Sequence, residues 1–249
     1  MMLLDVGNTT ARWAFTGGSG FTGQGSFVHR GREFDALADQ AWAGREAPDA
    51  LAVANVAGRS VQDAITHWAR EHWNLLPVFI RVAAGAAGVT NAYAIPEQLG
   101  VDRWAAMVAA WHEQKSAVLV IDCGSAITVD VVDAGGRHQG GLIAPGISMM
   151  RDSLSRDTAN IDILFSNQAR GVNLLSDGTE AAIRNGTIYM ASAMIDRVAA
   201  DVMERFDEGM RVVLTGGDAP VIQPLLGCRA IHDPDLVLKG IAILAEEQA

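Results

Sequence analysis

The sequence predicts an α/β protein built from two similar halves. Three observations support this prediction: a repeated motif, a repeated order of elements and the composition of a folded protein. The stretches "LLDVGNTTARWAF" and "VIDCGSAITVDVV" each place Asp-x-Gly between two apolar runs, and their aspartates, Asp5 and Asp122, lie 117 positions apart. Both halves begin with strands and continue with alternating helices and strands, which is typical of a duplicated α/β unit. With 49% hydrophobic and 19% charged residues, the chain has the composition of a folded protein.

The first half is expected to open with a strand, the turn "GNTT" and a second strand. Apolar periodicity and turn residues predict its elements in order. They are strands at 2–7, 11–16 and 23–29, a helix at 33–43, a strand at 49–56, a helix at 59–73, a strand at 76–82, a Gly- and Ala-rich loop at 84–100 and a helix from 102.

The second half repeats this order from "AVLVIDCG" onward. Its predicted elements are strands at 117–124, 126–134, 137–146 and 211–217, with helices at 146–155, 178–206 and 235–247. We therefore place the boundary near residue 116 and expect domains at 1–116 and 117–249.

Composition and charge narrow the class of partner. A net charge of −10 and the lack of a basic face argue against nucleic acid. The chain has neither an apolar run long enough for a membrane span nor the pattern of a signal peptide, so we expect a cytoplasmic protein without a membrane partner. Two cysteines are too few for a disulfide framework and lack metal-ligand spacing. A small-molecule partner is the best match.

The repeated turn is suited to binding phosphates. An aspartate at the end of a buried strand presents a fixed carboxylate, and the glycine after it lets a ligand approach the backbone closely. Asn8, Thr9, Thr10 and Ser125 add polar groups, and backbone N–H groups of such turns can face phosphate oxygens. One copy could be an ordinary turn, whereas two copies at half-chain spacing predict loops from both halves that converge on ATP. Neither the P-loop nor the Rossmann glycine pattern occurs.

A third glycine-rich turn, "LTGGDA", follows the strand predicted at 211–217. It could lie against the base or ribose of a nucleotide, or simply connect a strand to a helix.

The blocks "DVGNTTARW", "NAYAIPEQLGVDRW", "IDCGSAITVD", "GGLIAPGISMMRDSL" and "LTGGDA" together resemble the type III pantothenate kinases, within the superfamily of acetate kinase, sugar kinases and actin. The resemblance spans essentially the whole chain. It implies two duplicated ribonuclease H-like domains with a nucleotide cleft between them. It also implies transfer of the γ-phosphoryl group of ATP to the primary hydroxyl of pantothenate, the first step of coenzyme A biosynthesis, by a homodimer with active sites at the subunit interface.

Asp102 is the candidate general base of this reaction. It follows Gly100 and opens a helix, whose N-terminus should keep the carboxylate ionised. From spacing alone Asp102 could equally cap its helix. The block "LGVDRW" favours the catalytic role.

The resemblance assigns the pantothenate site to Tyr93, Gly100, Val101, Asp102 and Arg103. The guanidinium of Arg103 suits a carboxylate, although an isolated arginine is more often a surface ion pair. Tyr93 could also be a packed ring with an exposed hydroxyl. The resemblance further implies that Thr179 reaches the substrate from the partner subunit, and we expect the helix at 178–206 to form part of that interface.

The nucleotide phosphates are assigned to the first turn and to the second. The predicted ATP-binding residues are Asp5, Val6, Gly7, Asn8, Thr9, Thr10, Ala11, Arg12 and Ser125. Asp5 is expected to hold Mg²⁺ through water or a phosphate oxygen. By resemblance Asp122 binds a monovalent cation, potassium or ammonium; the residues alone do not distinguish it from a second Mg²⁺ carboxylate. Arg12 and Ser125 stand where the family usually has lysine and threonine.

Two other functions stay open on the sequence. One is a different small-molecule kinase of the superfamily, and the other is a non-catalytic nucleotide-binding accessory factor in transcriptional regulation. Asp5, Asp102, Arg103 and Asp122 favour an enzyme, because a binder has no need of a positioned base. An actin-like or chaperone ATPase would need inserted subdomains that 249 residues cannot hold.

Overall fold

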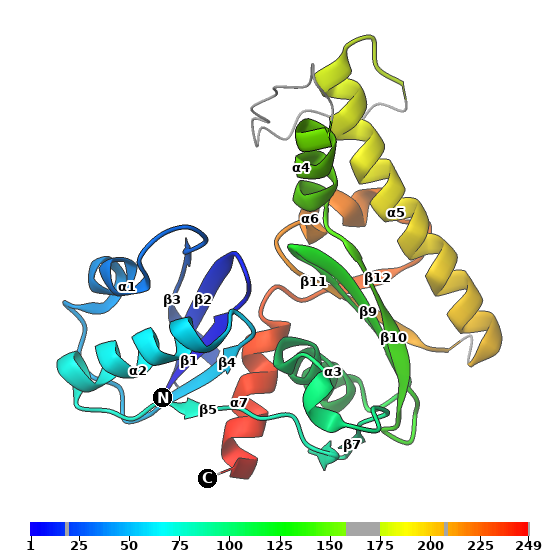
Figure 1. The fold of residues 1–249 in the computed structure, drawn as a ribbon. Coiled ribbons are helices and arrows are strands. Elements are labelled where there is room, and N and C mark those ends of the chain that lie inside the picture. The colour runs from blue at the N-terminus through cyan, green and yellow to red at the C-terminus, as the bar shows by residue number, and fades with distance from the viewer. Residues whose placement is uncertain (18–19, 158–174, 207–208, 249) are drawn as a thin grey trace. The chain divides into compact units, whose positions relative to one another are not determined.

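The structure, a computed structural model of the chain, describes residues 1–17, 20–157, 175–206 and 209–248. Its contacts divide the chain into two compact units. The first unit joins Met1–Glu113 to Asp235–Ala249, and the second comprises Gln114–Pro234. Figure 1 shows the elements of each unit in chain order.

The first unit is an α/β layer structure around a five-stranded sheet of order β3-β2-β1-β4-β5. Its strands are β1 (Met2–Val6), β2 (Thr10–Gly17), β3 (Gly20–Val28), β4 (Leu51–Asn55) and β5 (Val78–Phe79), with a small hairpin of β6 (Gly85–Ala86) and β7 (Val89–Thr90). Its helices are α1 (Phe34–Trp42), α2 (Arg59–Trp73), α3 (Val101–Gln114) and α7 (Leu236–Gln248), with the 3₁₀ turn η1 (Pro96–Gln98).

Strand alternation separates the two faces of this sheet. Met2, Leu4 and Val6 of β1 are buried in one core with residues of α1 and α2, so these helices cover that face. The intervening positions, Leu3 and Asp5, point to the opposite face. Since Asp5 is the last but one residue of β1, its carboxylate lies at the carboxyl end of a strand near the centre of the sheet.

The helix α2 shows how the sequence defines a helix in this unit. Ile65, Trp68, Ala69 and Trp73 recur at helical spacing and are buried. The helix ends at Asn74, which adopts the left-handed conformation with φ of 51° and donates its N–H to the carbonyls of Ala69 and Arg70. The sequence predicted both bounds of α2 correctly.

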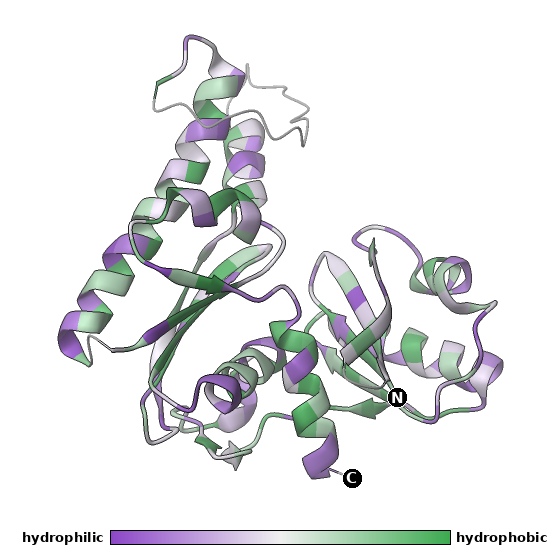
Figure 2. Cartoon of the chain, turned by 180° about the vertical axis from the view of Figure 1, so that it is seen from behind, coloured by the Kyte–Doolittle hydropathy of each residue, from purple (hydrophilic) through white to green (hydrophobic). Residues whose placement is uncertain are grey.

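The helix α7 belongs to the first unit, not to the second half in which the sequence analysis had placed residues 235–249. It packs against β1 and β4, and its backbone also comes close to α3, because a Cβ on Gly240 would overlap the backbone of Ala105. Figure 2 shows α7 as apolar over most of its length and polar at its C-terminal end. An apolar helix does not reveal in its own sequence which of two similar sheets it will cover.

The second unit repeats the architecture with a sheet of order β10-β9-β8-β11-β12. Its elements are β8 (Val118–Cys123), β9 (Ala126–Val132), β10 (His138–Pro145), α4 (Ile147–Asp157), α5 (Thr179–Arg205), β11 (Arg211–Thr215), α6 (Ala219–Ile222), the 3₁₀ turn η2 (Gln223–Leu225) and β12 (Ala230–His232). A single core joins alternate residues of β8, β9 and β11 to α4, α5 and α6.

The two sheets share one topology. β1 is antiparallel to β2 and parallel to β4; β8 is likewise antiparallel to β9 and parallel to β11. The α/β class and the duplicated order predicted from the sequence are therefore confirmed. The strand predicted at 76–82 is wrong in length, because only Val78 and Phe79 pair with β4, and β12 was not predicted.

Among the helices that the structure describes, none combines the length and apolar character needed to cross a bilayer.

Candidate active site

In the first unit, the turn between β1 and β2 is a tight loop at the carboxyl end of β1. The N–H of Gly7 donates to the carbonyl of Thr10 at 3.0 Å, and the N–H of Val56, just after β4, donates to the carbonyl of Val6 at 2.9 Å. Asn8 is exposed at the tip, whereas Val6 and Ala11 are buried and anchor the loop in the sheet. We call residues 7–10 the first phosphate loop, after its predicted role.

His29 supports the first phosphate loop from the end of β3, a contact that the sequence analysis missed. Its ring is buried, and Nε2 donates to the carbonyl of Gly7 at 2.8 Å. The backbone N–H groups of His29 and Arg30 both donate to the carbonyl of Thr9. These bonds fix two carbonyls of the loop and so limit the conformations available to it. The sequence signal for this contact was His29, a polar residue at the end of the strand in "SFVHR".

Arg12, a predicted ATP-binding residue, lies on β2 opposite Asp5 in the strand register. Its guanidinium forms an ion pair with Asp235, with 3.7 Å between Nη2 and Oδ1, and Gln24 donates to the other oxygen of that carboxylate at 3.1 Å. Asp235 directly precedes α7. This ion pair therefore links β2 of the first sheet to the residue that precedes α7.

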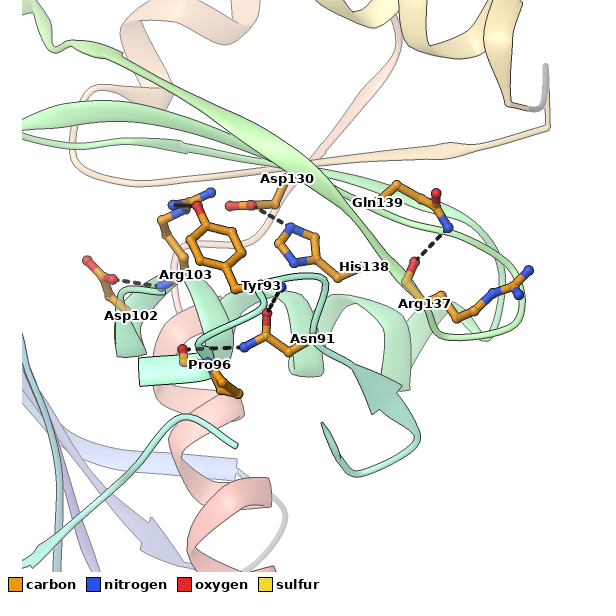
Figure 3. Close-up of polar contacts among 9 residues, drawn as sticks. All are labelled: Asn91, Tyr93, Pro96, Asp102, Arg103, Asp130, Arg137, His138 and Gln139. Atoms are coloured by element: carbon orange, nitrogen blue, oxygen red, sulfur yellow. Dashed lines mark hydrogen bonds and ion pairs between the residues drawn. The ribbon is translucent and has the colours of Figure 1, made fainter. Parts of the chain in front are cut away.

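The predicted pantothenate residues of the first unit lie together around the start of α3. Val101 and Asp102 open this helix, and Oδ1 of Asp102 accepts the N–H of Arg103 at 2.8 Å. Arg103 is 7% exposed; its Nη1 donates to the hydroxyl of Tyr93 at 3.2 Å, and its guanidinium carbon lies 5.9 Å from the centre of the Tyr93 ring. Figure 3 shows these three side chains around the helix terminus. The structure thus brings Tyr93, Asp102 and Arg103 together.

Asn91 and Gly100 help to hold this cluster in place. Asn91 accepts the N–H of Tyr93 through Oδ1 at 2.9 Å and donates from Nδ2 to the carbonyl of Pro96 at 3.5 Å (Figure 3), so it braces the loop that presents the tyrosine. At Gly100 any side chain would crowd the Asp102 carboxylate, because a Cβ would lie 2.5 Å from Oδ1. The sequence analysis missed Asn91, although an asparagine side chain commonly accepts a hydrogen bond from the backbone N–H two residues further along the chain.

In the second unit, Asp122 sits at the equivalent place, near the end of β8, among three glycine-containing turns. The turn at 124–125 closes with a bond from the N–H of Gly124 to the carbonyl of Ala126 at 3.1 Å, and the N–H of Gly146 donates to the carbonyl of Ser125 at 3.1 Å. Gly216 has φ of +94°, and a Cβ there would overlap both Oδ1 of Asp122 and the carbonyl of Cys123. Glycine at 216 thus lets the backbone pass close to the carboxylate of Asp122 and the carbonyl of Cys123, which also accepts the N–H of Asp218 at 2.9 Å.

Burial changes the pKa of two groups near this second loop. Burial, followed by the nearby carboxylates of Asp122 and Asp218, raises the pKa of the Cys123 thiol far above its ordinary value. Burial also raises the pKa of Asp218, and the neighbouring Arg151 partly offsets that effect. Arg151 donates from Nε to the hydroxyl of Thr187 at 3.1 Å and from Nη2 to the carbonyl of Arg184 at 3.2 Å. Asp218, which follows β11, is therefore partly desolvated and lies near the guanidinium of Arg151.

The other two predicted residues of the second unit are at its surface. Ser125 is exposed at the turn, and Thr179 is exposed at the first position of α5, after the N-cap Gly178. The sequence analysis also missed Asp130 and His138, a buried pair within β9 and β10 whose carboxylate and Nε2 lie 3.0 Å apart. Figure 3 includes this pair.

Comparison with known proteins assigns the family. The family model described as type III pantothenate kinase matches residues 1–201. The type III pantothenate kinase of Nitrosococcus oceani is 38% identical over 252 residues, which cover 99% of this chain and 94% of the relative.

Solved structures resemble the chain at the level of the fold. A Campylobacter jejuni protein described as a Baf family transcriptional activator is 20% identical, with a TM-score of 0.62 over 100% of this chain and 98% of that chain. The inorganic polyphosphate/ATP-glucomannokinase of an Arthrobacter strain is 16% identical, with a TM-score of 0.51 over 100% of this chain and 99% of that chain. Both similarities concern the fold alone and support the predicted α/β architecture.

Proposed function

The chain belongs to the type III pantothenate kinases, and from this premise we propose that Asp102 takes the hydroxyl proton while ATP phosphorylates pantothenate to 4'-phosphopantothenate at the start of coenzyme A biosynthesis. The observation that carries the assignment is the cluster of Asp102, Arg103 and Tyr93 at the start of α3. It combines a fixed carboxylate with a fixed guanidinium in one small region.

Asp102 is suited to orient the attacking hydroxyl. Phosphoryl transfer depends mainly on positioning and charge stabilisation, with a carboxylate to accept the proton of the nucleophile. The bond from the N–H of Arg103 fixes one carboxylate oxygen of Asp102 and hence the direction of the other. The rigid start of α3 and the absence of a side chain at Gly100 preserve this direction.

Arg103 is suited to hold the carboxylate of pantothenate. Its guanidinium is largely buried and lies against the Tyr93 ring, which leaves it few rotamers. A charged fork that is already ordered loses less entropy on binding an anion than a free arginine does. Gly100 and Val101 complete the loop, and Tyr93 adds a hydroxyl at the same place.

The two Asp-x-Gly loops are proposed to bind the nucleotide and its cations. Residues 5–12 would contact the phosphates, with Asp5 toward Mg²⁺; Ser125 would contribute from the second loop, and Asp122 would hold potassium or ammonium. The Asp122 carboxylate and the Cys123 carbonyl, which also accepts the N–H of Asp218, lie close together beside Gly216, and a hard cation prefers such oxygen ligands. When bound, Mg²⁺ would supply positive charge next to the transferring phosphoryl group.

The decisive experiment measures ADP release from ATP with and without pantothenate, in potassium and in sodium buffer, for the wild type and Asp102→Asn. We expect release that requires pantothenate and is faster in potassium. Loss of a general base costs roughly 10²–10⁴ in rate, so Asp102→Asn should lose kcat by that order while still binding ATP.

Glu97→Gln is the matched control, because Glu97 is an exposed carboxylate in the neighbouring η1 turn. It should retain the activity of the wild type. ATP binding without pantothenate-dependent ADP release would instead favour the accessory-factor function, and equal activity of Asp102→Asn and Glu97→Gln would remove Asp102 from the role of base.

A further inference from the structure

A cavity of about 360 Å³ opens in the first unit beside the first phosphate loop. It lies where β3 leads into α1 and where α2 begins, and Figure 1 shows both helices in this unit. Asn8, at the tip of the loop, and His29, at the end of β3, line one side of it. Its volume is within the range of small-molecule sites.

The polar wall of the cavity is positively charged. Arg30 and Arg32 line it, and among the described residues neither has a carboxylate partner. Within the described part of the chain no acidic side chain lines the cavity either; the nearby Glu33 and Asp35 are exposed outside it. In a chain of net charge −10, Arg30 and Arg32, which are two positions apart, therefore give the lining of this cavity an excess of positive charge.

The N-terminus of α2 adds to this positive character. Ser60 and Val61, in the first turn of this 15-residue helix, line the cavity. The first N–H groups of a helix have no partner within the helix and carry the positive end of its dipole. Here no side chain caps them, since the N-cap is Gly58, and the first turn contains no acidic residue.

Other residues that line the cavity are apolar, and we call them the apolar wall. Phe34 is 6% exposed and lines the cavity together with Ala57, Val61 and Ala64. A bare inorganic anion would leave this wall in contact with water, whereas a ligand with an apolar body would cover it. The two walls together match an anionic head joined to a small apolar group.

We propose that this cavity binds a small phosphomonoester, with the phosphate held by Arg30, Arg32 and the first turn of α2, and the organic part against Phe34 and Val61. Arginine pairs with phosphate through two parallel charge-assisted hydrogen bonds, and helix N-termini bind phosphate through backbone N–H groups. The site goes beyond the proposed function, and its existence does not depend on that function. Of the residues proposed to contact the nucleotide, only Asn8 also lines the cavity, so the two sites are expected to bind their ligands independently.

Calorimetric titration of the full chain with phenyl phosphate and, separately, with inorganic phosphate tests the proposal. Phenyl phosphate should bind more tightly, because its ring covers the apolar wall. The double variant Arg30→Gln/Arg32→Gln should weaken phenyl phosphate binding by at least about tenfold, the effect expected of lost charge-assisted bonds. Saturating ADP should leave the affinity unchanged.

The matched control is Arg70→Gln/Arg81→Gln, which removes two charges from exposed positions of the first unit that do not line the cavity. It should bind phenyl phosphate as the wild type does. A second variant, Ser60→Asp, puts a carboxylate in the first turn of α2, where it favours the helix but repels an anion. It should abolish binding in a protein at least as stable as the wild type.

Several results would overturn the proposal. They are failure of both probes to bind, equal weakening by the two double variants, retention of binding by Ser60→Asp, or displacement of phenyl phosphate by ADP. Displacement by ADP would mean that the cavity is part of the nucleotide site. All of these results can be read without measuring kinase activity, so they remain distinct from a failure of the proposed function.

Discussion

At the scale of single residues, the best-defined environment is the one around Asp122. Its carboxylate stands next to Gly216, where the backbone is left-handed and where a side chain would overlap both Asp122 and Cys123. The thiol of Cys123 points away from this carboxylate into the core of the second unit, since strand neighbours face opposite ways. The carboxylate of Asp122 and the buried thiol of Cys123 thus lie on opposite faces of β8.

This arrangement predicts a pH dependence of stability above about pH 9. Burial and the two carboxylates keep the Cys123 pKa raised in the folded chain, whereas the unfolded thiol ionises at its ordinary value of 9.0. The stabilising effect is therefore complete below pH 9 and declines as pH rises further, by up to about 1.4 kcal/mol per pH unit. Urea unfolding between pH 7 and 10 should show a steeper loss in the wild type than in Cys123→Ala. Parallel pH curves would contradict this prediction.

At the scale of elements, the contact between α3 and α7 joins the candidate base to the end of the chain. α3 carries Asp102 at its start, and Gly240 of α7 contacts the backbone of Ala105 one turn further on. The approach is possible only because position 240 has no side chain. Packing of α7 therefore helps to fix the helix that carries Asp102 and Arg103.

Gly240→Ala should separate these two helices. Overpacking a close contact typically costs about 1–3 kcal/mol, and the expected effect is local, because α7 packs on β1 and β4. Hydrogen exchange of amides in β1 and β4 should accelerate. Gly44→Ala is the control, since a Cβ at Gly44 meets nothing within 4 Å; if both variants exchange alike, the contact has no structural role.

The elements also show what a sequence can specify. The bounds of α2 were predictable because an apolar stripe and an Asn terminator act locally. The three-residue strand β12 is too short for a periodic signal, and the position of α7 depends on partners far away in the chain. In the candidate site, Asp102 and Arg103 were proposed from a recognisable block. His29 was not, because its hydrogen-bond partner, Gly7, lies 22 positions away.

At the scale of the whole molecule, we expect a homodimer in which Thr179 contributes to the partner's substrate site. Thr179 is exposed at the start of α5, and the same helix exposes Tyr189 by 55% and Met190 by 61%. Large apolar side chains grouped on a surface helix often mark an interface.

Met190→Asp should therefore dissociate the dimer and lower activity with it, as sedimentation and ADP release would show together. Leu76→Asp is the control, because Leu76 is 62% exposed and belongs to the first unit, not to α5. A wild-type monomer with full activity at working concentration would contradict the expected assembly.

The return of α7 to the first unit has a consequence for the order in which the protein matures on the ribosome. β1 and β4 are synthesised before the second unit, whereas α7, the helix that packs on them, is synthesised after it. The second unit, Gln114–Pro234, is by contrast continuous in sequence and can close as soon as it has emerged. The second unit can thus fold from one uninterrupted segment, whereas the first unit is complete only after the segment that begins at Asp235 has also left the ribosome.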